Sequence, residues 1–91
     1  DLNKGVDIKK LEKTLNAEYS KCRFVKILKT NFLLSTNDVI NTNNCSIVIC
    51  KTKYKTRVII LSAIDNLIKG GAGQAIQNMN LRFNFPKNKG L

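Results

Sequence analysis

The sequence predicts an α+β domain in which an antiparallel hairpin leads into a C-terminal helix. Two β-branched runs, 45–50 and 57–64, are separated by the polar and charged segment 51–56, which is typical of a hairpin. Before and after them, apolar residues recur every three or four positions, which is the period of a helix. The 91 residues suffice for one small domain.

The first helix is expected over residues 6–20. Its apolar residues fall three or four positions apart, and most of its charges lie off that face: Ile8, Leu11, Leu15 and Tyr19 form the apolar stripe. Asp7 can cap its start. Residues 24–28 predict a short strand. Residues 29–43 have no clear period and are rich in Asn, Ser and Thr, so we expect a long loop that is functional or rests on a partner.

The second half of the chain predicts the hairpin and the last helix. The run 57–64 is apolar on both faces, which predicts a strand covered on both sides and therefore partners beyond this chain. Residues 67–83 then follow a 3.6-residue repeat, with Asp65 or Asn66 supplying the cap oxygen. Pro86 and Gly90 end regular structure in a short tail.

The formal net charge of +10 raises the question of nucleic-acid binding. The cations are scattered, no basic stripe alternates with aromatics, and the richness in Lys, Asn and Ile is what an A+T-rich genome over-uses. We therefore expect solvated basic faces and no specific nucleic-acid partner. No apolar run reaches the roughly 18 residues of a membrane span, and the N-terminal residues have no apolar core of a signal peptide. We expect no membrane partner.

The cysteines and the absence of histidine limit the chemistry. Cys22, Cys45 and Cys50 are an odd number without a C-x-x-C pair, so we expect free, buried thiols in the reducing cytoplasm. None has a neighbouring base in the sequence that would make it a nucleophile. No metal site is expected, and an enzyme built on this chain would need most of its catalytic groups from elsewhere.

The start of the last helix contains Gly70, Gly71 and Gly73, each of which costs a helix about 1 kcal/mol relative to Ala. Such a cost indicates close approach of the backbone to another element or to a ligand, and the residues alone leave both open. The segment fails the dinucleotide fingerprint at its third glycine position, where Ile76 stands, and no Gly-Lys-Ser/Thr motif exists.

Residues 65–80, DNLIKGGAGQAIQNMN, and the tail 81–91, LRFNFPKNKGL, closely resemble the C-terminal end of the N-acetyl-gamma-glutamyl-phosphate reductase family. Upstream the resemblance extends to residue 11, through the strand 24–27 and through Thr42, Asn43, Cys45 and Ile47. Arg23, Asn41 and Ser46 depart from the family pattern, which has Pro, Gly and Asp there.

The resemblance implies a fragment of the sheet domain of a glyceraldehyde-3-phosphate-dehydrogenase-like reductase. Residues 1–64 would be the C-terminal part of the catalytic and dimerisation domain. Residues 65–91 would be the terminal helix and tail, packing on a Rossmann domain absent from this chain. The family reduces N-acetyl-glutamyl phosphate to the semialdehyde with NADPH in arginine biosynthesis, through a cysteine thioester. That cysteine and its histidine lie upstream, and none of the three cysteines here matches the nucleophile.

The same resemblance implies roles for five residues. Asn66 would meet the nicotinamide carboxamide of NADP, with Gly70 and Gly71 beside it, and Thr42 and Asn43 would lie in a loop on the substrate side. The implied partners are the Rossmann domain, an acyl phosphate and further copies of the enzyme in a homo-oligomer. Two alternatives stay open: a reductase of the aminoadipyl analogue in lysine biosynthesis, and a non-catalytic remnant or basic binding module. The 91 residues alone are expected to be inactive.

Overall fold

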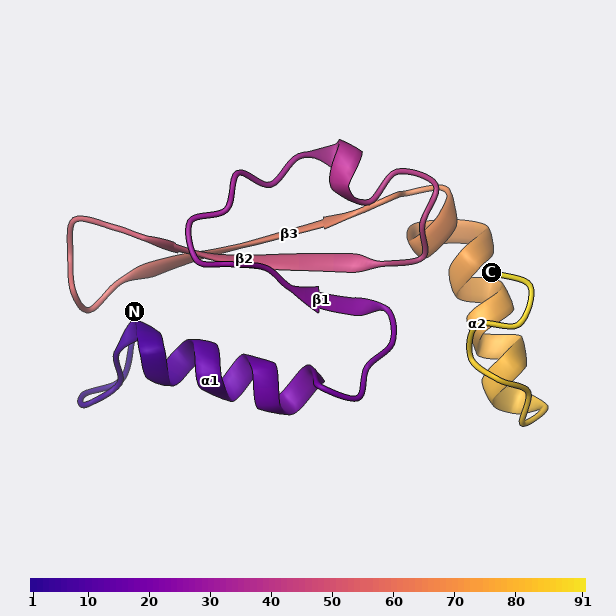
Figure 1. Cartoon of the computed structure of the whole chain (residues 1–91), viewed down its shortest axis with the longest axis horizontal. Coiled ribbons are helices and arrows are strands. Elements are labelled where there is room, and N and C mark those ends of the chain that lie inside the picture. Colours follow the sequence, from indigo (N-terminus) through magenta and orange to yellow (C-terminus); the bar gives the residue numbers. More distant parts are fainter.

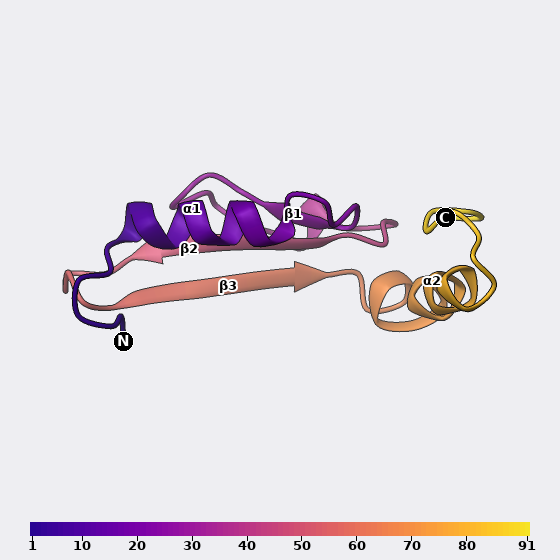
Figure 2. The same ribbon diagram turned by 90° about the horizontal axis from the view of Figure 1, so that it is seen from below.

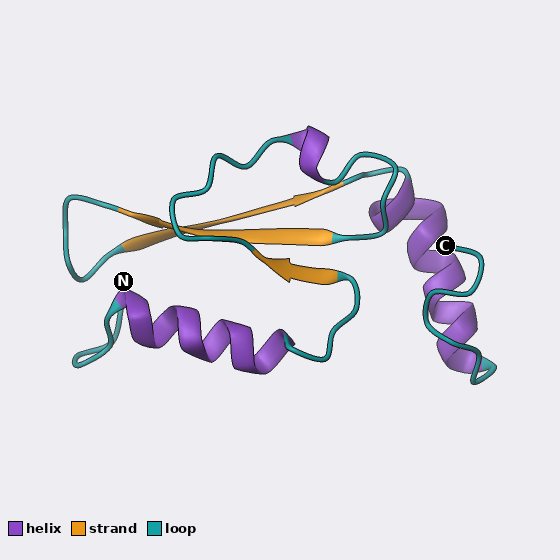
Figure 3. Cartoon of the chain, in the orientation of Figure 1, coloured by secondary structure: helices purple, strands orange, loops and turns teal.

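The computed structural model describes all residues from Asp1 to Leu91 and has an α+β fold, as the sequence predicts. Three strands form one mixed sheet with the order β1-β2-β3. Figure 3 shows the helices, strands and connecting segments. In chain order the elements are α1 (Ile8–Tyr19), β1 (Val25–Ile27), a 3₁₀ turn η1 (Thr36–Asp38), β2 (Cys45–Lys51), β3 (Val58–Ile64), a π-helical turn η2 (Ile68–Ala72) and α2 (Gly73–Arg82).

The predicted hairpin is confirmed: β2 and β3 are antiparallel, with Cys45 opposite Ile64 and Lys51 opposite Val58. The short predicted strand pairs with the other side of β2, and this pairing is parallel, with Val25 opposite Cys45. Parallel neighbours need a long connection, and segment 28–44 provides it. We call this segment the crossover loop. It is the predicted long loop, and it contains η1.

The core lies at β2, the central strand. Val48 and Ile49 are adjacent and therefore point to opposite faces of the sheet, yet both are almost fully buried, at 0% and 1% exposed. Helix α1 packs on β1 and β2, and η1 contacts β3. Figures 1 and 2 show α1 on one side of the sheet and the crossover loop on the other. Both faces of β2 are therefore covered within this chain.

Local hydrogen bonds define α1. The Asp7 side chain accepts from the backbone N–H of Lys10 at 2.8 Å, which confirms the predicted cap. The Thr30 hydroxyl donates to the Glu12 carboxylate and joins the helix to the start of the crossover loop. Helix α1 thereby contacts the crossover loop as well as the sheet.

The second helical region differs from the single helix predicted over 67–83. It is divided into η2 and α2, and Gly71 inside η2 has non-helical backbone angles (φ −145°, ψ −114°), which kink the helical region there. The apolar period is the same on both sides of the kink, which is why the pattern does not reveal it. Figure 1 shows α2 projecting beyond the end of β3, away from the sheet.

The three cysteines are free, as expected, but each is partly exposed, so the expectation of buried thiols is wrong. Cys45 begins β2 and Cys22 precedes β1, which places both near an end of the small sheet where little covers them. Neither helix is long and apolar enough to cross a bilayer.

Candidate functional site

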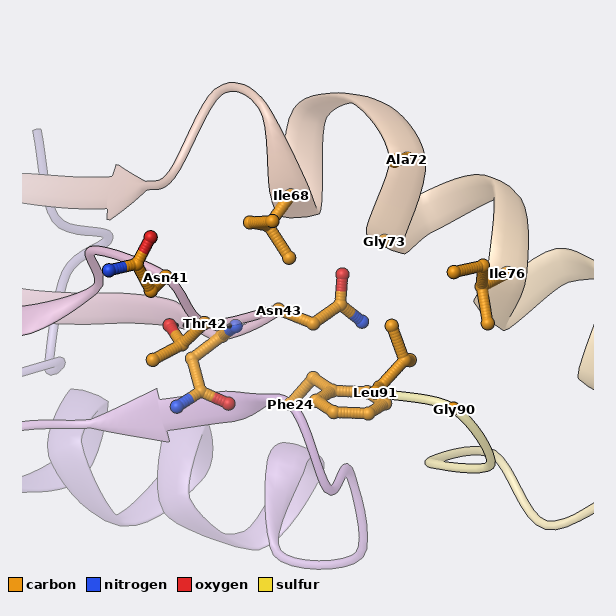
Figure 4. A pocket seen from close by; sticks show the side chains of 11 residues that line it. Phe24, Asn41, Thr42, Asn43, Ile68, Ala72, Gly73, Ile76, Gly90 and Leu91 are labelled. Atoms are coloured by element: carbon orange, nitrogen blue, oxygen red, sulfur yellow. Dashed lines mark hydrogen bonds between the residues drawn. The ribbon is translucent and has the colours of Figure 1, made fainter.

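A pocket of about 430 Å³ lies where the crossover loop meets η2, α2 and the C-terminal tail. Figure 4 shows its side chains, with Asn43 pointing toward the helix and Phe24 close to Leu91. No lining residue carries an ionisable side chain, so the pocket offers apolar surface and amide groups. The lining residues are Phe24, Asn41, Thr42, Asn43, Asn44, Ile68, Ala72, Gly73, Ile76, Gly90 and Leu91.

Asp65, directly after β3, fixes the two segments that frame the pocket. One carboxylate oxygen accepts from the backbone N–H groups of Leu67, at 2.8 Å, and Ile68, at 3.2 Å. The other oxygen accepts from the N–H of Asn41 at 2.8 Å. The hydrogen bond from Asn41, followed by that from Leu67, lowers the pKa of Asp65. Of the two predicted cap residues, Asp65 is therefore the one that caps.

The turn η2 presents the predicted cofactor residues on its exposed side. Asn66 precedes the turn, and its side-chain oxygen lies over Gly70, where an added Cβ would come within 2.8 Å. Only glycine therefore lets the Asn66 amide lie against the turn. At Gly71 an added Cβ would meet only the Asn66 carbonyl oxygen, at 3.4 Å. All three residues are exposed, and none of them lines the pocket.

Asn43 joins the crossover loop to α2. It is 5% exposed, and its Nδ2 donates to Oε1 of Gln77 at 2.8 Å. The ammonium of Lys69 donates to the same oxygen at 2.8 Å and lies 5.4 Å from the ring centre of Phe24. Loop, turn and helix therefore share one hydrogen-bond acceptor, and Gln77 is the residue that supplies it.

Gly73 lies opposite Asn43 at the first turn of α2 and is buried. An added Cβ would come within 2.5 Å of Asn43 Oδ1 and 2.6 Å of the Ile68 carbonyl oxygen. The Asn43 Oδ1 itself has no hydrogen-bond partner. This is the close backbone approach to another segment that the glycine-rich sequence indicates, and it occurs at Gly73.

Thr42 supports the loop from within. Its hydroxyl donates to the Val39 carbonyl at 2.6 Å and accepts from the N–H of Asn44 at 3.3 Å. Val39 is completely buried and anchors this end of the crossover loop. The Thr42 side chain thus helps to shape the loop that borders the pocket.

Asn80 holds the tail against α2. Its side chain is completely buried, and Nδ2 donates to the carbonyl groups of Lys87 and Lys89, both at 2.9 Å. These bonds turn the tail back, so that Gly90 and Leu91 reach the pocket (Figure 4). The sequence gives no signal for this role of an asparagine in a polar stretch of helix. The carbonyl groups that it binds belong to an irregular tail, and the path of such a tail leaves no repeating pattern in the sequence.

The predicted site residues therefore form two groups. Thr42 and Asn43 border the pocket, whereas Asn66, Gly70 and Gly71 lie on the exposed side of η2. Sequence reasoning did not single out Gln77 or Asn80, and it included Gly73 only among the costly glycines. Gly73 and Gln77 are four residues apart and so share a helix face, which is the signal that could have found them. No three His, Cys, Asp or Glu side chains come together as metal ligands.

Comparison with known proteins gives one family match and several similar relatives. The family described as "Semialdehyde dehydrogenase, dimerisation domain" matches residues 1–66. An N-acetyl-gamma-glutamyl-phosphate reductase of Vesicomyosocius okutanii is 46% identical over the whole chain, which covers 25% of that relative. One of Halothermothrix orenii is 40% identical over 99% of the chain and 26% of the relative. One of Geotalea daltonii is 52% identical over 75% of the chain and 20% of the relative.

The chain thus spans about a quarter of the length of these relatives. The resemblance to N-acetyl-gamma-glutamyl-phosphate reductases is confirmed along the crossover loop, β2, β3 and the glycine-rich turn, since the alignments cover all of these elements. The chain belongs to the semialdehyde dehydrogenase dimerisation-domain family.

Proposed function

We propose that this chain is the C-terminal part of an NADPH-dependent N-acetyl-gamma-glutamyl-phosphate reductase. The whole enzyme would convert N-acetyl-glutamyl 5-phosphate to N-acetyl-glutamate 5-semialdehyde in arginine biosynthesis. The observation that carries the proposal is the 46% identity over all 91 residues to a reductase of that name. The kinked turn η2, with non-helical backbone angles at Gly71, supports it, because irregular helical turns often lie at functional sites.

Asn66, Gly70 and Gly71 fit a role toward the nicotinamide end of NADP. A carboxamide needs both a donor and an acceptor, and the Asn66 side chain offers both from an exposed position. Gly70 leaves room for that side chain, and Gly71 presents a surface without a side chain on which a flat ring can lie. When bound, NADPH would supply the hydride. The residues of this chain would orient its ring.

The crossover loop at Thr42 and Asn43 would form part of the substrate side. Thr42 shapes the loop, and Asn43 couples the loop to α2 through Gln77. Asp65 ties the same loop to the start of η2. Through these bonds, a change in the loop would move the turn that we assign to the cofactor.

The rest of the enzyme would supply what this chain lacks. The chain contains no histidine, and a thioester mechanism needs a cysteine with a base beside it. We therefore assign the nucleophile, its base and the Rossmann domain to the longer polypeptide. The dimerisation domain matched over residues 1–66 supports a homo-oligomer, and the free thiols support a cytoplasmic location.

The decisive experiment is a kinetic assay of the full-length protein. We expect oxidation of NADPH that depends on N-acetyl-glutamyl phosphate, with release of phosphate. N-acetyl-aminoadipyl phosphate should be a poorer substrate, and a preference for it would identify the lysine-pathway enzyme instead. A folded full-length protein that reduces neither acyl phosphate would contradict the proposal and favour a non-catalytic remnant.

A further inference from the structure

The second strand of the hairpin is apolar but uncovered. β3 pairs with β2 on one edge only, and its other edge has no partner strand in the sheet. Ile59 and Leu61 point to one face and Ile60 to the other, because neighbouring residues alternate. These three side chains are 51%, 45% and 52% exposed. A seven-residue apolar strand with a free edge is a site for pairing with another strand.

The first residues of the chain lie beside the beginning of this free edge. The N–H of Leu2 donates to the carbonyl of Thr56 at 2.7 Å, in the manner of a strand pair. Nε of Arg57 lies 2.8 Å from a carboxylate oxygen of Asp1. In Figure 2 the N-terminus lies next to the start of β3, on the side away from β2.

These two contacts also define the direction in which a segment paired with β3 would run. From Leu2 to Asp1 the residue number falls, while from Thr56 to Arg57 it rises toward β3. A segment that continued this pairing would therefore run antiparallel to β3. In antiparallel pairs the backbone groups of both strands are satisfied by bonds perpendicular to the strands.

We propose that the residues preceding Asp1 in the longer polypeptide form a strand antiparallel to β3 along its free edge. This inference rests on the proposed function, because it requires that the chain is the C-terminal quarter of a larger enzyme. The added strand would make β3 an interior strand. Because β3 is apolar on both faces, the added strand should itself carry apolar side chains on both faces and no proline at an amide that faces β3.

A second copy of the chain is the competing occupant. Thr56 and Arg57 argue against it, because their contacts already place this chain's own N-terminal residues at the start of the edge. A second copy pairing there would have to displace both contacts. The dimer implied by the family description then needs another surface of residues 1–66.

Amide hydrogen exchange in the full-length protein tests the proposal. We expect every amide of residues 58–64 to be protected as strongly as those of β2, at least about tenfold slower than the exposed part of the crossover loop. This protection should not change when the protein is diluted. Rapid exchange of alternate β3 amides would overturn the proposal, and so would protection that is lost on dilution, which would identify a second copy.

Substitutions provide a second measurement. Ile60→Lys and Leu61→Lys place a charge on opposite faces of β3, and both should lower the melting temperature of the full-length protein. Leu33→Lys is the matched control, since Leu33 is 91% exposed in the crossover loop. Equal tolerance of all three variants would contradict an interior β3. The acyl-phosphate assay of the wild-type protein tests the function separately, so activity with an unprotected β3 would reject only the strand proposal.

Discussion

Nδ2 of Asn43 donates to Oε1 of Gln77 across 2.8 Å and so joins the crossover loop to α2, two segments 34 residues apart in the chain. The helix itself has few contacts with the strands, because it projects beyond the end of β3 (Figure 1). The position of α2, and with it that of the glycine-rich turn, therefore depends on a small number of polar contacts at one end of the molecule.

Replacing Gln77 by Ala should release α2. The change leaves the Asn43 amide, which is buried, and the Lys69 ammonium without their common acceptor, and a loss of about 1–3 kcal/mol of stability is expected. The measurement is the hydrogen exchange of α2 amides in the full-length protein. Gln77→Glu keeps an oxygen at this position and should restore most of the protection, whereas equal protection in Gln77→Ala and the wild type would contradict the coupling.

Gly73→Ala should destabilise the same junction, although alanine favours helices. Its Cβ would come within 2.6 Å of the Ile68 carbonyl oxygen, which belongs to the backbone and cannot rotate away. Overpacking of this kind costs about 1–3 kcal/mol. Asn78→Ala is the control, since Asn78 is exposed on the same helix. A melting temperature of Gly73→Ala equal to or above that of the control would show that Gly73 is not tightly packed against the Ile68 carbonyl group.

Asn66→Ala and Gly70→Val should weaken the use of NADPH by the full-length enzyme. The first removes one hydrogen-bonding side chain, worth about 0.5–1.5 kcal/mol, and should raise the KM for NADPH by the corresponding factor. The second pushes the Asn66 amide aside, because its Cβ would lie 2.8 Å from Oδ1, and should be more severe. If Asn66→Ala left the cofactor kinetics unchanged in a folded protein, Asn66 would lose its assigned role.

The carboxylate of Asp65 should make the stability of the junction depend on acid pH. Its pKa in the folded protein is lowered by the N–H of Asn41 and then by that of Leu67. The charged carboxylate therefore makes its full contribution to folding stability above the unfolded pKa of about 3.9. The contribution is lost as the pH falls through the lower folded pKa. Asp65→Asn should therefore melt below the wild type at neutral pH, and the difference should shrink below about pH 4.

Glu18→Gln is a matched control for this titration, because Glu18 is exposed on α1. It removes one carboxylate from the chain without touching the junction. A gap between wild type and Asp65→Asn that stays constant down to the acid unfolding transition would argue that the Asp65 charge has no part in stability.

Binding to nucleic acid should be weak and nonspecific despite the net charge of +10. Several lysines gather on the hairpin tip 51–56, but no base-reading element accompanies them. Affinity measured on duplex DNA of two unrelated sequences should be equal and should fall steeply as salt rises. Sequence-selective, sub-micromolar binding at physiological salt would contradict the interpretation of the charge as solvated surface.

Periodicity predicts those elements whose packing is local. The apolar spacing of α1, the β-branched runs of the hairpin and the cap at Asp7 all appear as expected. The parallel pairing of β1 with β2 could not be predicted, because it depends on how the crossover loop packs, which leaves no repeating pattern in the sequence. The π-helical turn is likewise hidden, since one additional residue per turn over five residues hardly changes the apolar period.

The resemblance singled out the predicted site residues, and their roles toward cofactor and substrate stay predictions. Thr42 and Asn43 do border a pocket, but the role of Asn80 depends on two carbonyls of an irregular tail. The glycines show a second limit of sequence reasoning. The glycine content indicates that the backbone closely approaches another group. Only the structure distinguishes Gly73, which lies against the crossover loop, from Gly70, which leaves room for the Asn66 side chain.

The double attachment of Asp65 has a consequence for how this position can evolve. Aspartate and glutamate commonly replace one another on protein surfaces, since the charge is kept and the longer side chain finds room in solvent. Here both carboxylate oxygens already accept hydrogen bonds, one from the N–H of Asn41 in the crossover loop and one from the N–H of Leu67 before η2. A side chain that is longer by one methylene cannot keep both hydrogen bonds. Among homologous sequences, position 65 should therefore accept neither glutamate nor asparagine readily, because the Nδ2 of asparagine donates hydrogen bonds and cannot accept from either N–H group.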